Sequence, residues 1–109
     1  MVITSPFPAL DIPDVDLVSY VFEHVGRHPD RPALIDGATG AVTTHRELRD
    51  QVRAVAAGLA ARGIGPGDVV GIFSPNVADY PAAFLGVAAA GATNTTANGL
   101  YGVDELAFQ

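Results

Sequence analysis

Hydrophobic residues recur at intervals of four and three along the segment that follows Thr44. The apolar positions of this segment are Leu48, Val52, Val55 and Leu59. This spacing places them on one face of an α-helix, with charged residues on the remaining surface. Thr44 and Glu47 have the spacing of a capping box, in which each side chain pairs with the backbone amide of the other residue. The pattern predicts a helix that begins after Thr44 and ends near Arg62 and Gly63.

A shorter helical pattern and a hairpin pattern precede this helix. Asp16 can cap the shorter helix, and Gly26 and Pro29 are expected to end it. Its apolar face is expected to consist of Leu17, Val21 and Val25. Residues 32–36, "PALID", and residues 41–43, "AVT", have the composition of two short strands joined by a glycine-containing turn. These strands predict a β-hairpin.

The second half of the chain predicts a strand, a helix and a second strand. Residues 68–74, "DVVGIFS", form a continuous apolar run, which is typical of a parallel strand covered on both faces. The helix that follows has Asp79 as its candidate cap, Pro81 in its first turn and Gly91 at its end. Its apolar positions are Phe84, Leu85, Val87 and Ala88. Residues 92–97 then return as a strand, so the fold class is α/β, with a crossover that should be right-handed.

The chain is expected to form an incomplete unit. After Asp104 a further helical pattern starts and reaches Gln109 within about two turns, which is too short for an independently stable helix. We expect residues 1–109 to be one partial domain without an internal boundary, the opening part of a larger α/β domain. The isolated chain should then associate through the apolar faces that this part leaves uncovered.

Polar residues follow the predicted return strand. In a parallel sheet the ligand crevice lies beyond the carboxyl ends of the strands, and Thr95, Thr96 and Asn98 are candidates to face it. The alternative is that threonine suits a strand and that Asn98 and Gly99 form a tight turn. Tyr101 has the same two interpretations, a pocket wall or a side chain packed over the turn.

Composition narrows the classes of function. The 109 residues carry a net charge of −6, six arginines, no lysine and no cysteine. The acidic balance argues against nucleic acid as a partner, and the absence of cysteine excludes disulfides and thiolate nucleophiles. The first 16 residues contain three prolines and no basic residue, unlike a signal peptide. Since the uncharged apolar run 82–92 is shorter than the roughly 20 residues of a membrane span, we expect a cytoplasmic protein.

Several local motifs suggest a functional site, but an ordinary structural explanation is favoured for each of them. Gly65, Gly67 and Gly71 have the wrong spacing for a dinucleotide fingerprint and do not follow a strand, as that fingerprint must, so a turn at Pro66 and Gly67 is favoured. His24 and His28 share a helical face, but no third metal ligand is evident. The serines Ser5, Ser19 and Ser74 lack a nucleophile elbow. The aspartates Asp11, Asp14 and Asp16 lack the glycine and closing glutamate of a calcium loop.

Five segments, taken in order and spacing, carry a resemblance to a known superfamily. They are "PALID", "TTHREL", "GIGPGDVVGIFSPN", "AAFLGVAAAGA" and "TTANGLYGVDEL". From about Pro6 to Gln109 the chain resembles the N-terminal part of adenylate-forming enzymes, of the branch of 4-coumarate-CoA ligase-like and fatty acyl-CoA synthetases. The resemblance covers nearly all of this chain and about the first fifth of such an enzyme.

The resemblance implies a two-step reaction for the complete enzyme. A carboxylate attacks the α-phosphate of Mg-ATP to give an acyl-adenylate and pyrophosphate, and the thiol of coenzyme A then displaces AMP. The phosphate loop and the catalytic lysine that the family uses are absent from this chain, which has no lysine. We therefore assign no catalytic, cofactor-binding or metal residue here, and expect ATP, Mg²⁺, coenzyme A and a small carboxylic acid to bind only in the complete enzyme.

The chain departs from the family pattern at four positions. Thr43 and His45 stand where aromatic residues usually flank the capping threonine, Gly99 stands where proline is usual, and Gly102 replaces threonine or serine. Gly102 is expected to be a weaker helix cap and Gly99 to loosen the turn before it. These departures fit a divergent active ligase and a fragment under relaxed selection equally well.

Three classes of function remain open. The first is the N-terminal portion of an acyl- or aryl-acid CoA ligase, inactive by itself. The second is a non-catalytic interaction or split-complementation module whose partner is the remainder of the enzyme or a complementing chain. The third is a small nucleotide-binding domain.

Overall fold

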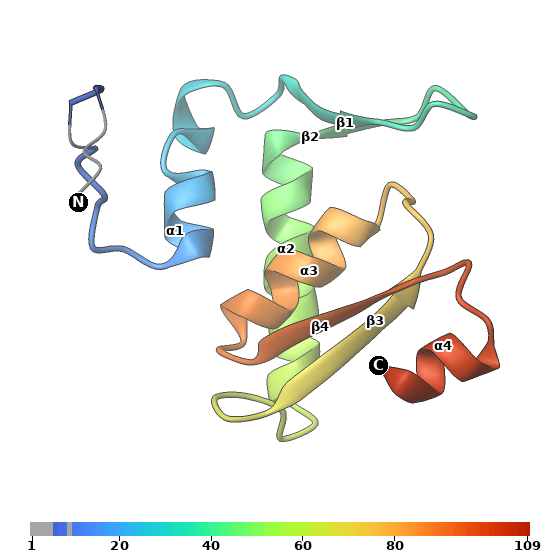
Figure 1. Ribbon diagram of the computed structural model, residues 1–109. Coiled ribbons are helices and arrows are strands. Elements are labelled where there is room, and N and C mark those ends of the chain that lie inside the picture. The colour runs from blue at the N-terminus through green and yellow to red at the C-terminus, as the bar shows by residue number, and fades with distance from the viewer. Residues whose placement is uncertain (1–5, 9) are drawn as a thin grey trace.

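The computed structural model describes residues 6–8 and 10–109 (Figure 1). The helices are α1 (Leu17–Phe22), η1 (Val25–Arg27, a 3-10 helix), α2 (His45–Ala60), α3 (Tyr80–Ala89) and α4 (Val103–Phe108). The strands are β1 (Pro32–Ile35), β2 (Val42–Thr44), β3 (Val69–Ser74) and β4 (Thr93–Asn98). Helix α3 packs against α2 on one side and contacts the β3–β4 sheet on the other. The fold class is α/β, as predicted. None of the helices in residues 6–8 and 10–109 is long and apolar enough to cross a membrane.

The predicted hairpin is confirmed. Strands β1 and β2 pair antiparallel, with Ile35 opposite Val42. The turn between them is organised by Asp36, whose Oδ1 accepts bonds from the Thr39 backbone N–H at 2.7 Å and the Thr39 hydroxyl at 2.8 Å. These bonds hold the pKa of the Asp36 carboxyl below its usual value, and the bond from the Thr39 hydroxyl has the largest effect. Gly40 closes the turn at a φ of +73°, which favours glycine.

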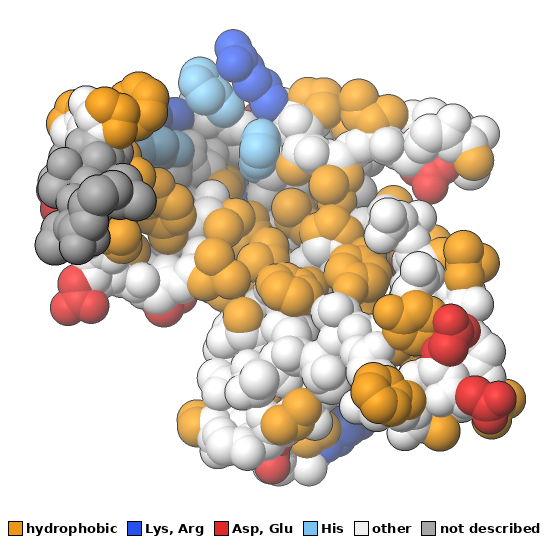
Figure 2. All heavy atoms as spheres, viewed as in Figure 1, with side chains coloured by type: hydrophobic (Ala, Val, Ile, Leu, Met, Phe, Trp, Pro, Cys, Tyr) orange, Lys and Arg blue, Asp and Glu red, His pale blue; other side chains and the backbone are white. Residues whose placement is uncertain are grey.

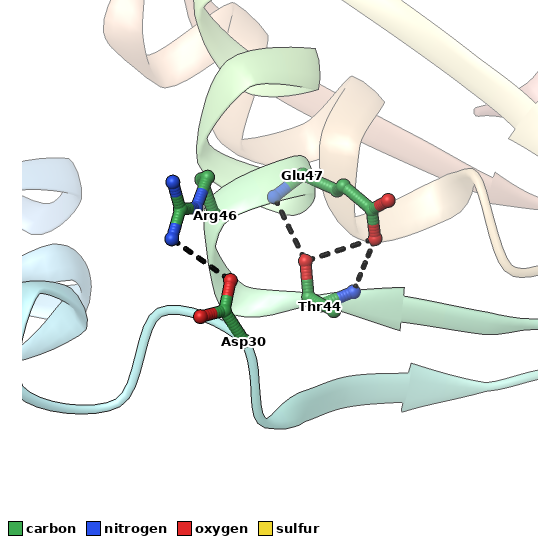
Figure 3. Close-up of polar contacts among 4 residues, drawn as sticks. All are labelled: Asp30, Thr44, Arg46 and Glu47. Atoms are coloured by element: carbon green, nitrogen blue, oxygen red, sulfur yellow. Dashed lines mark hydrogen bonds and ion pairs between the residues drawn. The ribbon is translucent and has the colours of Figure 1, made fainter.

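The predicted capping box at the start of α2 is also confirmed (Figure 3). The Glu47 backbone N–H donates to Thr44 Oγ1 at 3.3 Å, and the Thr44 N–H donates to Glu47 Oε2 at 2.8 Å. An ion pair between Arg46 and Asp30, 2.8 Å from Nη2 to Oδ1, ties the first turn of α2 to the preceding loop. The helix ends at the predicted place, where Gly63 adopts a φ of +78°.

The hydrophobic core lies where α1, α2 and α3 meet. Val52 of α2 is 1% exposed, and Leu48 and Ala82 are buried beside it. The partly buried side chains around this cluster are Val18, Phe22, Ala33, Leu34 and Leu85. Two of the four apolar residues predicted for α2, Leu48 and Val52, are therefore fully in the core, whereas Val55 and Leu59 are half-buried.

The prediction for the first helix was wrong in its length and its face. Asp16 does cap it, accepting from the Ser19 N–H at 2.8 Å, but the α-helix ends at Phe22. Val18 and Phe22 pack against the core, whereas Leu17 and Val21 are 52% and 46% exposed. The helix is too short for Val25 to continue its face, and Val25 is buried instead through the separate turn η1.

The predicted strand–helix–strand unit is present. Strands β3 and β4 are parallel, in register from the pair Val69 and Thr93 to the pair Ser74 and Asn98. The face of β3 toward α3 is covered, as predicted, whereas cover of the opposite face stays a prediction. Val69 and Phe73, on the face away from α3, are 64% and 52% exposed, because among the described residues only α4 lies against that face.

Helix α3 confirms Pro81 in its first turn and Gly91 at its end, with a φ of +79°. The prediction that the Asp79 side chain caps this helix was wrong. Asp79 has helical backbone angles, so its side chain makes no cap bond, and its carbonyl accepts from the Ala83 N–H at 3.1 Å. Helix α4 begins at Val103, two residues before Glu105, where the pattern after Asp104 was expected to start.

Candidate functional site

The carboxyl ends of β3 and β4 meet at one edge of the sheet, which is where an open parallel sheet usually binds a ligand. Ser74 pairs with Asn98, and the segments that follow β3 and β4 leave the sheet through Pro75 and Gly99. A Cβ placed on Gly99 would lie 2.6 Å from the Pro75 nitrogen and 2.8 Å from the Ser74 carbonyl carbon. Glycine is what allows these two segments to touch, and the expectation that Gly99 loosens the turn stays a prediction.

The polar residues expected at this edge do not converge on one point. Asn98 is at the edge, but its Oδ1 accepts from the Leu100 N–H at 3.0 Å and its backbone oxygen from the Tyr101 N–H at 2.9 Å. Its side chain thus builds the tight turn, as the alternative interpretation proposed. Thr95 and Thr96 lie inside β4 on opposite faces, because successive residues of a strand alternate.

A hollow open to solvent lies beside this edge, between the turn and α4. It is lined by Tyr101, Asp104, Glu105, Phe108 and Gln109. Glu105 Oε2 accepts from the Gly102 N–H at 2.8 Å, so half of a capping box remains although Gly102 has no hydroxyl to supply the other half. Figure 2 shows acidic side chains beside hydrophobic ones over α4.

The charge of this hollow is unsuited to a nucleotide. Its ionisable lining residues include two carboxylates, and a triphosphate needs cations or an amide nest to balance its charge. All six arginines of the chain lie between Arg27 and Arg62, ahead of β3, and none of them lines the hollow. Tyr101 is a wall of the hollow and is 38% exposed.

The other motifs considered in the sequence have local structural roles. His24 and His28 flank η1, and the described residues contain no group of three or more histidines, aspartates or glutamates that could hold a metal ion. Gly67 has a φ of +94° in the predicted turn, which the Gly65 N–H closes on Asp68 Oδ2 at 2.9 Å. The Ser74 hydroxyl donates to the neighbouring Pro75 carbonyl.

Four further candidate residues belong to the first 19 residues of the chain. Ser5 lies outside the described residues. Ser19 contributes its amide to the Asp16 cap. Asp11 and Asp14 are exposed in the segment before α1.

Sequence reasoning missed two residues that determine the packing around the sheet. Gly86 allows α3 to lie close against α2, and Asn94 of β4 donates from Nδ2 to the Phe84 carbonyl at 3.1 Å. A glycine inside an otherwise apolar helix and an asparagine inside a strand were the available signals, since both residues are unfavourable at such positions unless packing requires them.

The fold recurs in solved structures. A benzoate CoA ligase from Burkholderia xenovorans LB400 superposes with a TM-score of 0.78 at 28% identity, over 86% of this chain and 19% of that one. The arrangement of helices around a parallel β3–β4 pair is thus that of the N-terminal part of an adenylate-forming enzyme.

Sequence comparison gives the family. The AMP-binding enzyme family matches residues 21–109. The chain is 42% identical over 106 residues to a 4-coumarate–CoA ligase of Pinus taeda, and 40% identical over 109 residues to one of Oryza sativa subsp. japonica. These alignments cover 96% and 99% of this chain and 20% of each relative. The chain belongs to the AMP-binding enzyme family and spans about a fifth of the length of the curated relatives it matches.

Proposed function

We propose that this chain is the N-terminal part of an ATP-dependent ligase that joins an aryl or acyl carboxylic acid to coenzyme A through an acyl-adenylate. The observation that carries the proposal is the 40–42% identity to 4-coumarate–CoA ligases along almost the whole chain. The superposition on a benzoate CoA ligase supports the same class of reaction, because that relative also joins a carboxylic acid to coenzyme A. ATP, Mg²⁺ and coenzyme A are the co-substrates and metal that this function requires.

The role proposed for this segment is structural. Departure of pyrophosphate builds negative charge that lysine, arginine, magnesium or an amide nest must stabilise. The chain contains no lysine, and its arginines are remote in sequence from the carboxyl edge of the sheet. We therefore expect the segment to hold part of the large domain in shape while other residues of the ligase supply the chemistry.

The uncovered face of the β3–β4 sheet supports this role. Val69 and Phe73 expose apolar surface on strands whose outer edges are unpaired in the described residues. Such a face is stable in a parallel sheet when further elements cover it. We infer that residues 1–109 form part of one larger domain, and that the remainder of the ligase, or a complementing chain, packs on this face.

A chimeric enzyme tests the proposal. The segment of the Pinus taeda 4-coumarate–CoA ligase that aligns with this chain would be replaced by residues 1–109, and formation of the coenzyme A thioester of 4-coumarate would be measured. We expect activity clearly above that of the same ligase lacking the segment. The isolated chain should give no ATP–pyrophosphate exchange.

Two outcomes would contradict this assignment. A chimera that unfolds cooperatively, yet forms neither adenylate nor thioester, would show that the segment does not serve this function. Exchange catalysed by the pure isolated chain would instead favour an independent nucleotide-binding domain.

A further inference from the structure

A cleft is lined by residues of α1, α2 and α3. Figure 1 shows how these three helices are arranged. The walls of the cleft include Val18, Phe22, Arg49, Val52, Arg53 and Ala56. No residue of β3 or β4 lines it, so the cleft is distinct from the carboxyl edge of the sheet. Its volume of about 360 Å³ is at the lower end of the range found for small-molecule sites.

One part of the cleft is apolar and fixed by the core. Val52 is 1% exposed and forms the most deeply buried part of the lining. Val18 and Phe22, one turn apart on α1, pack against the same core cluster and are partly buried. An aromatic ring or a short hydrocarbon chain would bury apolar surface on both itself and these side chains, which favours its binding.

The other part of the cleft is cationic. Arg49 and Arg53 are one turn apart on α2, so their side chains lie on the same face of that helix. The Nε of Arg49 is buried and has no hydrogen-bond partner. The carboxylate oxygen paired with it belongs to the adjacent Asp50, at 3.5 Å, and the Asp50 side chain is 58% exposed. A pair of this kind is weak, and the Arg49 side chain is 32% exposed, so the exposed part of its guanidinium group can pair with a stronger acceptor in the cleft.

We propose that this cleft binds a small organic carboxylate with an apolar body. The carboxylate accepts hydrogen bonds from the guanidinium groups of Arg49 and Arg53, and the body packs against Val18 and Phe22. Guanidinium groups suit a carboxylate because two parallel N–H donors match its two oxygens. A neutral apolar molecule would make no charge-assisted hydrogen bond with these arginines, and an inorganic anion would leave the apolar wall in water.

The inference is independent of the proposed ligase function, since it uses none of the residues at the sheet edge. The probe is 4-phenylbutanoate, titrated into the isotopically labelled 109-residue chain while backbone amide shifts are recorded by NMR. Shifts are expected in α1 and in the Arg49–Ala56 part of α2. The alcohol 4-phenylbutanol and inorganic phosphate should each bind at least about tenfold more weakly than the acid, because each makes only one of the two kinds of contact.

Matched arginine variants complete the test. Arg49→Gln and Arg53→Gln should each weaken binding of 4-phenylbutanoate about tenfold. Arg62→Gln is the control, because Arg62 donates to the Gly58 carbonyl at 2.7 Å and does not line the cleft. Retention of the dispersed amide spectrum shows that a variant is folded.

The opposite results would overturn the proposal. Equal affinity for the acid and the alcohol, unchanged binding by Arg49→Gln, or shifts confined to α4 would each show that the cleft is not the site. A wild-type chain without a dispersed amide spectrum would have no formed cleft, and that result would overturn the proposal as well. The chimera assay is unaffected by any of these outcomes, so the two proposals fail separately.

Discussion

Gly86 of α3 lies so close to Val55 of α2 that a Cβ placed on the glycine would be 2.4 Å from Val55 Cγ1 and 2.6 Å from Val55 Cβ. Real side chains do not approach so closely, so the spacing of the two helices depends on this glycine. Both helices contribute to the buried core through Val52 and Ala82. The contact between Gly86 and Val55 therefore sets the position of the β3–α3–β4 unit relative to α2.

Replacement of this glycine should loosen the packing of the two helices. We expect Gly86→Ala to lower the free energy of unfolding by about 1–3 kcal/mol, because the added methyl group must push Val55 or the whole of α3 aside. The gain in helix propensity from glycine to alanine, about 1 kcal/mol, would offset part of a larger strain. Urea denaturation of the variant and the wild-type chain measures the difference.

A control and a second variant separate the effect of the contact between Gly86 and Val55 from the effect of replacing any helical glycine. Gly58→Ala lies in α2, where the nearest atom to the new Cβ is the end of the flexible Arg62 side chain at 3.4 Å, so it should be neutral or stabilising. Val55→Ala should be less damaging in the Gly86→Ala background than in the wild type, because it makes room for the methyl group. Strictly additive effects of the two substitutions would contradict direct contact.

The capping box at the start of α2 gives a second prediction. Thr44→Ala should lower the free energy of unfolding by about 1 kcal/mol, because Thr44 Oγ1 then no longer accepts from the Glu47 N–H. Thr44→Ser keeps the hydroxyl and should lose much less. Thermal unfolding followed by circular dichroism measures both, and equal losses in the two variants would show that the hydroxyl is not the stabilising group.

The same box makes stability depend on pH. The bond from the Thr44 backbone N–H, and then that from its hydroxyl, lowers the pKa of the Glu47 carboxyl. A carboxyl whose pKa is lowered by folding stabilises the protein above its unfolded pKa. That contribution is lost as the pH falls through its folded pKa. We expect the fall in stability below about pH 4.5 to be shallower in Glu47→Gln than in the wild type.

A matched substitution tests whether this slope comes from the capping box. Asp14→Asn, at an exposed position before α1, should leave the low-pH slope close to that of the wild type. An unchanged slope in Glu47→Gln would contradict the role given to this carboxyl. Asp16 and Asp36, whose pKa values are also lowered by hydrogen bonds, should account for part of the slope that remains.

Elements with local chemical signals were the ones that sequence predicted well. The capping box, the hairpin turn and the glycines after α2 and α3 act through neighbours within four residues, so their patterns are visible along the chain. The face of α1 was predicted wrongly because Val18 and Phe22 are selected by contact with Leu48 and Val52, which are distant in sequence. The apolar run of β3 predicts a strand covered on both faces, but it does not reveal which segment of the protein supplies the cover of each face.

The candidate site shows the same limit. The position of Asn98 at the carboxyl edge of the sheet followed from the strand order, but the use of its side chain in the turn depends on geometry. The contact of Gly99 with Pro75 was missed because it joins segments that are far apart in the sequence. The apposition of Arg49 with α1 was missed for the same reason.

Gly99 provides a third prediction. Gly99→Ala should separate the two segments that leave the sheet, because its Cβ would lie 2.6 Å from the Pro75 nitrogen and the backbone cannot rotate away as a side chain can. We expect a loss of about 1–3 kcal/mol in the free energy of unfolding and large amide shifts around residues 74–76 and 98–101. Gly37→Ala is the control, since no atom lies within 4 Å of its added Cβ. Similar losses in both variants would show that the loss at Gly99 does not come from its contact with Pro75.

Asn94 gives the last prediction, because its part-buried amide joins β4 to α3. Its Nδ2 donates to the Phe84 carbonyl, and its Oδ1 is buried without a partner. In Asn94→Asp an ionised carboxylate would have no proton to donate and would face the carbonyl oxygen directly. We expect a loss of about 1–3 kcal/mol at pH 7.

The sign of the pH effect distinguishes this cause from a simple loss of packing. Burial and the facing carbonyl both disfavour the charged form, so the pKa of the introduced carboxyl should be raised. When the pH falls below that pKa the protonated acid can donate to the Phe84 carbonyl, and the penalty relative to wild type should shrink at pH 4. Asn76→Asp, at an exposed position after β3, is the matched control and should show no such penalty at pH 7. A penalty for Asn94→Asp that is the same at pH 7 and pH 4 would mean that the loss of stability does not come from the charge. The hydrogen bond to the Phe84 carbonyl would then contribute little to the packing of β4 against α3.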